Sequence, residues 1–127
     1  MDSINNPMNI VKGFLMGIID NIQKERDKNR QRLIEDALRE ADKVAKILVE
    51  RFGAKEVILF GSLLDKKYFD QASDIDLAVK GLGDKYFQAY GYCLRNSKLN
   101  LDIRAYEDMN LKLKNIINER GKKIYEK

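Results

Sequence analysis

The chain has 127 residues, of which 44% are hydrophobic and 35% are charged, and its net charge is +4 at pH 7. This composition is typical of a soluble globular protein, and we expect neither a disordered nor a membrane-embedded chain. Histidine is absent, which excludes Ser-His-Asp and Cys-His catalysis, zinc sites that need imidazole and a histidine general base. Any catalysis must therefore use carboxylates, lysines, tyrosines or a hard metal ion.

The first part of the chain predicts helices. Between residues 8 and 22, apolar residues recur at the spacing of one helix face, namely Ile10, Val11, Phe14, Leu15, Ile18, Ile19 and Ile22. The polar sequence KERDKNRQR at residues 24–32 is either a linker or an exposed helical turn. The apolar repeat resumes at Leu33 and ends near Gly53, which predicts a long amphipathic helix closed by a glycine cap.

These helices suggest two parts, an N-terminal helical extension over residues 1–30 and a domain over residues 31–127. The apolar stripe of the extension must be covered, because exposed apolar surface costs roughly 25 cal/mol per Å². It either packs across the sheet of the domain or docks on a partner subunit, which includes a second copy of this chain in a homo-oligomer.

The rest of the chain predicts a small mixed sheet flanked by helices, an α+β fold. Three strands are expected from apolar or alternating runs, at residues 56–60, 74–79 and 99–106. Two further helices are expected at residues 84–96 and 109–119, followed by a short tail. The single cysteine, Cys93, falls in the first of these helices as a packing residue. A lone cysteine forms no internal disulfide, which favours a reducing, cytoplasmic location.

Two aspartates carry the clearest chemical signal. Asp74 and Asp76 are two positions apart in a predicted strand, so their carboxylates project from the same face. Such carboxylates repel and raise each other's pKa unless a positive group lies between them. Oxygen ligands alone favour Mg²⁺ or Mn²⁺ over zinc. Because Mg²⁺ usually completes its shell with substrate phosphates, the pair predicts a nucleotide.

Gly61 and Ser62 follow the first predicted strand. Glycine lets the backbone come close to a ligand, and serine opens a short helical turn whose exposed amides bind anions. A triphosphate could lie on these amides while its other edge contacts a metal ion held by Asp74 and Asp76.

In-line transfer across two metal ions needs more than two carboxylates. Asp102 lies in the strand at residues 99–106. If that strand pairs beside the strand of Asp76, Asp102 can serve as the third ligand or as the general base. Glu107 and Asp108 compete for this role, but they follow the end of the strand. Arg104 shares the face of Asp102 and either pairs with an acid or contacts a phosphate.

Three segments resemble the signature of the DNA polymerase beta nucleotidyltransferase superfamily: Phe-Gly-Ser at 60–62, Ser-Asp-Ile-Asp-Leu-Ala-Val at 73–79 and Leu-Asp-Ile at 101–103. The resemblance spans about residues 40–127 and is strongest to the minimal nucleotidyltransferases. It implies a mixed sheet flanked by helices, with Gly61 and Ser62 on the triphosphate of ATP. It also implies that Asp74, Asp76 and Asp102 hold Mg²⁺, with two ions expected, and that Asp102 helps to deprotonate the attacking hydroxyl.

Minimal nucleotidyltransferases of this kind are commonly paired with a HEPN-family toxin, which is a ribonuclease. The resemblance therefore implies an antitoxin of a type VII-like toxin-antitoxin pair that transfers AMP from ATP to a tyrosine of the toxin. Two alternatives stay open: an antitoxin that neutralises by binding alone, and a nucleotidyltransferase that acts on a small molecule or RNA. Neither a membrane nor, under the first interpretation, a nucleic acid is expected as a partner.

Overall fold

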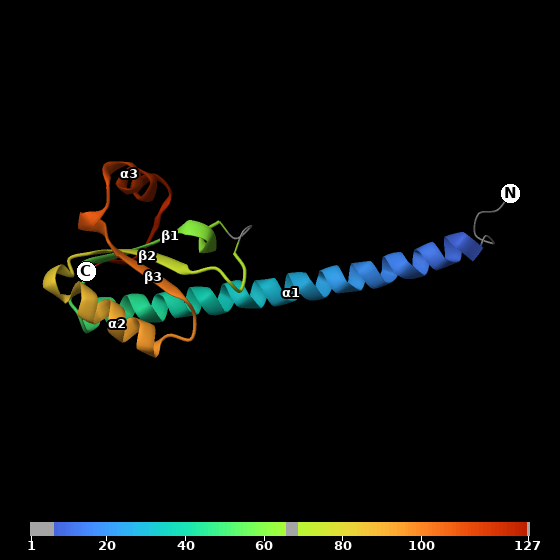
Figure 1. Ribbon diagram of the computed structural model, residues 1–127, viewed down its shortest axis with the longest axis horizontal. Coiled ribbons are helices and arrows are strands. Elements are labelled where there is room, and N and C mark those ends of the chain that lie inside the picture. Colours follow the sequence, from blue (N-terminus) through green and yellow to red (C-terminus); the bar gives the residue numbers. More distant parts are fainter. Residues whose placement is uncertain (1–6, 66–68, 127) are drawn as a thin grey trace. The chain divides into compact units, whose positions relative to one another are not determined.

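A computed structural model describes residues 7–65 and 69–126, with side chains from residue 13 onward (Figure 1). The chain divides into two compact units, residues 1–32 and 33–127. A single helix, α1 (Pro7–Glu50, 44 residues), runs through the boundary between them. The polar segment at residues 24–32 is therefore helical and is not a linker. Among the helices that the structure describes, none combines the length and apolarity that a bilayer crossing requires.

The second unit contains all the strands found in the described residues. After α1 come, in order, β1 (Glu56–Phe60), β2 (Ile75–Lys80), α2 (Tyr86–Asn96), β3 (Leu101–Ala105), α3 (Leu111–Arg120) and β4 (Lys122–Glu126). The predicted strands and helices of this region are confirmed, with ends that shift by one or two residues. The short tail that we expected is a fourth strand instead. Its two apolar residues, Ile124 and Tyr125, are half-buried and pack against the core.

The sheet has the strand order β3-β2-β1-β4 (Figure 1). β1 pairs antiparallel with both β2 and β4, whereas β2 and β3 are parallel. The pairing of β2 with β3 that the sequence analysis required is thus confirmed. In this register Asp76 lies beside Asp102 on one side and beside Phe60 on the other.

The two faces of the sheet carry different helices, as Figure 1 shows for α2 and α3. One face forms the main core with α2 and with the part of α1 from residue 33 onward. Its strand residues include Leu59, Leu77 and Ile103, which are almost fully buried. The other face holds a smaller cluster, in which Ile117 of α3 covers Ile58 and Ala78. Since side chains alternate along a strand, Asp76 and Asp102 belong to this second face.

The small cluster gives a stability prediction. Ile117→Ala should lower the free energy of unfolding by about 2–4 kcal/mol, because it leaves a cavity where a side chain that is 1% exposed had packed. Ile116→Ala is the matched control, since that side chain is 42% exposed, and it should change stability by about 0.5 kcal/mol or less. Urea unfolding followed by circular dichroism measures both. Equal effects of the two substitutions would show that α3 is not anchored through Ile117.

Candidate active site

The turn after β1 is closed around Gly61. The carbonyl oxygen of Gly61 accepts hydrogen bonds from the amides of Leu64 and Asp65, at 3.2 and 3.3 Å. The backbone of Gly61 has a φ of +78°, in the region that favours glycine. A Cβ atom built at this position would collide with the carboxylate of Asp76. Gly61 therefore gives the acid the space it occupies, which is a role that the sequence analysis did not foresee.

Asp76 is half-buried on β2, beside Asp102 on β3. Burial, the negative charges of Asp102 and Asp74, and a hydrogen bond with Asp102 raise the pKa of Asp76 to about 6, while Arg104 opposes the rise. Desolvation and like charges both favour the protonated carboxyl. The ionised form of Asp76 is therefore destabilised in the folded protein, and a bound cation would remove this destabilisation.

Asp74 lies one residue before β2 and is exposed. The prediction that it lies within the strand is wrong by this one residue. Its charge nevertheless contributes to the raised pKa of Asp76, so the two acids remain electrostatic neighbours. The strand begins at the next residue, where the amide of Ile75 donates to the carbonyl of Asn100 at 2.8 Å.

A polar turn at residues 70–73, just before Asp74, is closed by side-chain hydrogen bonds. The side chain of Asp70 accepts from the amide of Ala72 at 2.9 Å and from the hydroxyl of Ser73 at 3.1 Å. The hydroxyl of Ser73 in turn accepts from the amide of Asp70 at 3.0 Å. The sequence analysis did not find this positioning turn. The signal for it was an Asp followed three residues later by a Ser, a pattern typical of side-chain-closed turns.

Arg104 pairs with an acid in the structure, which is one of the two roles that the sequence analysis considered for it. Its Nη2 atom lies 3.1 Å and its Nε atom 3.2 Å from Oδ2 of Asp102. The hydrogen bond to Asp102 is the main cause that raises the pKa of the Arg104 guanidinium. The second charged neighbour that raises it is Asp76. One guanidinium therefore balances part of the negative charge of both half-buried carboxylates.

Glu107 and Asp108, the two acids that compete with Asp102, are not paired with Asp76 in the sheet. The carboxylate of Glu107 accepts from the amide of Gly81 at 2.7 Å, which ties it to the loop after β2. Asp108 is exposed and lines a cavity of about 350 Å³ beside Arg104. The other residues that line this cavity are Tyr86, Ala105, Met109, Asn110 and Leu113. Asp102 is thus the acid that the sheet places next to Asp76.

The donor set fits a hard divalent cation. Asp74, Asp76 and Asp102 offer only oxygen ligands, which Mg²⁺ and Mn²⁺ prefer. A cation among them would relieve the repulsion that raises the pKa of Asp76. Within residues 7–65 and 69–126, no three acidic or thiol side chains are already gathered as a metal-binding cluster, and Asp102 is paired with Arg104.

Comparison with known proteins assigns the chain to a family. The family model described as "Polymerase beta, Nucleotidyltransferase" matches residues 42–127. The chain therefore belongs to the polymerase beta nucleotidyltransferase family, as the sequence motifs indicated. No curated protein sequence matches it.

A solved structure has a similar fold. It is a crystal structure of a mutant toxin-antitoxin pair, MntA-HpeT, whose matching chain is 16% identical with a TM-score of 0.56. The match covers 68% of this chain and 73% of that one. At this identity the likeness supports the fold, a mixed sheet flanked by helices.

The close approach of Gly61 to Asp76 can be tested by a double-mutant cycle. Gly61→Ala should destabilise the protein by more than the about 1 kcal/mol expected of left-handed backbone strain alone, because its Cβ meets the Asp76 carboxylate. Gly83→Ala is the control, since Gly83 has a φ of +54° with nothing near its missing Cβ. Asp76→Ala should recover part of the loss at residue 61 and none at residue 83. Strictly additive effects of Gly61→Ala and Asp76→Ala would contradict the proposed contact.

The raised pKa of Asp76 predicts a pH dependence of stability. Between about pH 4 and pH 6 the folded protein keeps a proton that the unfolded chain has released, because the pKa rises from 3.8 to about 6 on folding. The contribution of Asp76 to the free energy of unfolding should therefore decrease as pH rises through this window and stay level above it. Subtracting the curve of Asp76→Asn from that of the natural sequence isolates the effect. A difference that is flat with pH would show that the carboxyl is unperturbed.

Proposed function

We propose that this nucleotidyltransferase transfers AMP from ATP to a hydroxyl group of a partner protein, a tyrosine of a HEPN-family ribonuclease toxin, and so acts as its antitoxin. The observation that carries the proposal is the placement of Asp76 directly beside Asp102, with Asp74 just before the same strand and the Gly61 turn against it. Acids so placed suit a site where negative phosphates and metal ions meet.

Asp74, Asp76 and Asp102 would hold Mg²⁺, and we propose two ions. The metal would neutralise the phosphates and stabilise the charge that develops during transfer. The backbone at Gly61 and Ser62 would contact the triphosphate. Asp102 would either complete the metal site or accept the proton of the attacking hydroxyl as its oxygen bonds to the α-phosphorus and pyrophosphate leaves.

Arg104 must then change its partner. Its guanidinium neutralises Asp102 in the structure, and it also lines the cavity that Asp108 and Tyr86 share. An arginine at that position is suited to a phosphate, because its planar fork matches phosphate oxygens. Metal and nucleotide would thus replace the ion pair that holds the acids in their absence.

A protein acceptor is favoured over a nucleic acid or a small molecule. One structural neighbour is a toxin-antitoxin pair, and that mutant carries glutamate in place of two aspartates two positions apart, the spacing of Asp74 and Asp76.

The activity can be measured with α-labelled ATP and Mg²⁺, with and without the protein encoded by the neighbouring gene, followed by mass spectrometry of the products. We expect AMP on a tyrosine of that partner. Asp102→Asn should lower kcat by about 100-fold or more with little change in the KM for ATP, because a third ligand or base acts mainly on the chemical step. Asp74→Asn combined with Asp76→Asn should abolish transfer and leave the fold intact.

Asp84→Asn is the control for loss of an acid, since Asp84 is exposed at the turn before α2 and should keep full activity. Neutralisation of the partner by every variant without transfer would favour an antitoxin that acts by binding alone. Labelling of RNA or of a small molecule, with an unlabelled partner, would favour the other alternative.

A further inference from the structure

The first unit of the structure presents apolar side chains to solvent. Between residues 13 and 22 of α1, six large hydrophobic side chains are 41–69% exposed: Phe14, Leu15, Met16, Ile18, Ile19 and Ile22. Exposed apolar patches of this kind mark interaction surfaces. All but Met16 fall on one broad stripe, because residues three, four and seven apart share a helix face.

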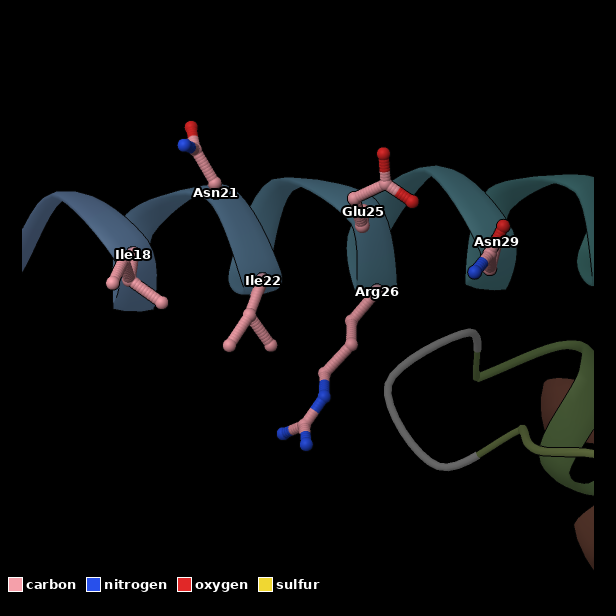
Figure 2. A pocket seen from close by; sticks show the side chains of 6 residues that line it. All are labelled: Ile18, Asn21, Ile22, Glu25, Arg26 and Asn29. Atoms are coloured by element: carbon pink, nitrogen blue, oxygen red, sulfur yellow. The ribbon is translucent and has the colours of Figure 1, made fainter.

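Three residues of the stripe, Leu15, Ile18 and Ile22, have the spacing of one coiled-coil heptad, and the positions that continue this spacing are polar. Leu15, Ile22 and Asn29 are seven residues apart, and Ile18 and Glu25 fall between them at the second position of the repeat. Figure 2 shows the side chains that line a pocket on this surface, with Ile18, Ile22 and Arg26 projecting to one side of the helix and Asn21 to the other. Its lining residues are Ile18, Asn21, Ile22, Glu25, Arg26 and Asn29.

The pocket has the geometry of two consecutive holes for a facing helix. A coiled-coil hole is formed by four residues, which on one helix lie at positions i, i+3, i+4 and i+7. The lining residues make two such sets, one starting at Ile18 and one starting at Ile22. From Leu15 to Asn29 the surface is about 20 Å long. This length matches a partner helix.

The charge of the surface changes along its length. The half up to Ile22 is apolar, whereas residues 24–32 hold five basic and two acidic residues. Arg26 and Lys28 occupy the positions that flank the seam of the repeat, where charges select the partner of a coiled coil. Both side chains are exposed. A helix that covers this surface must therefore be apolar where it faces Leu15, Ile18 and Ile22, and acidic at the flanking positions beside Arg26 and Lys28.

A second copy of this chain fits poorly. In a parallel pair, the basic segments of the two copies would lie side by side and repel each other. In an antiparallel pair, only the short apolar halves would overlap, and pairing so few turns is marginal in water.

We propose that residues 14–32 form a docking surface for an amphipathic helix of a different protein, with an apolar seam and acidic flanking residues. The surface contains none of the three aspartates, so the proposal goes beyond nucleotidyl transfer and does not depend on it.

The probe is a synthetic helical peptide of about four heptads, with leucine at the seam and glutamate at the flanking positions. It is titrated against the full-length chain by fluorescence anisotropy in about 0.1 M salt. The control peptide carries lysine in place of every glutamate. We expect the acidic peptide to bind at least about tenfold more tightly than the basic one, and to weaken as salt increases.

Two matched variants locate the surface. Arg26→Glu should weaken binding of the acidic peptide by about tenfold or more. Lys24→Glu makes the same charge change on the opposite side of the helix and should have a much smaller effect. Ile18→Asp should remove binding of the peptide, with circular dichroism confirming that α1 stays helical.

Three results would overturn the proposal. The first is equal binding of the acidic and basic peptides, or equal effects of Arg26→Glu and Lys24→Glu. The second is sedimentation of the chain alone as a dimer that Ile18→Asp dissociates, which would make a second copy the occupant. The third is binding to anionic lipid vesicles in preference to the acidic peptide, which would make this segment a membrane-surface helix.

Discussion

The parallel register of β2 and β3 is the constraint on which the candidate site depends. It sets Asp76 beside Asp102 on one face of the sheet, where both carboxylates are half-buried. Their repulsion is relieved only in part by the guanidinium of Arg104. The same carboxylate of Asp76 fills the space next to residue 61, so the residue that follows β1 must be glycine. The turn at Gly61, β2 and β3 are thus three separate segments whose residues are constrained by the pair of Asp76 and Asp102.

Because side chains alternate along a strand, one face of the sheet contributes to the main core and the other face carries the acids. Ile75 and Leu77 of β2 are fully buried in the main core, while Asp76, between them, projects to the opposite face. On that face α3 covers Ile58 and Ala78 through Ile117 and leaves the acids partly exposed. A strand held firmly by its apolar residues can therefore carry a carboxylate whose charge is unfavourable where it lies.

Much of the site could be predicted because it follows strand periodicity. Apolar residues mark β1 and β2 strongly, so the spacing of Asp74, Asp76 and Gly61 could be interpreted directly. Other features could not be predicted so easily. Lys122 and Lys123 dominate the β4 sequence, and its apolar residues become significant only once β1 offers an edge with which to pair. The pairing of Arg104 with Asp102 depended on which side chain lay within reach in the folded sheet.

The functional roles of the three aspartates remain predictions, whereas their proximity is a property of the fold. A third acid could be chosen from sequence only on the condition that its strand lay next to β2. Strand order is set by which edges and faces pack together across the whole domain, and a local pattern of residues contains little of that information.

The sequence by itself determined the absence of histidine chemistry, the nature of the strands and helices, and the aspartate motif with its glycine. These depend on residue types and on spacing along one segment. Only the tertiary structure decided that Asp102 lies beside Asp76, that Gly61 makes room for a carboxylate, and that Glu107 is bonded to Gly81. The physical reason is that each of these is a contact between segments far apart in the chain, and such contacts are fixed by packing and register.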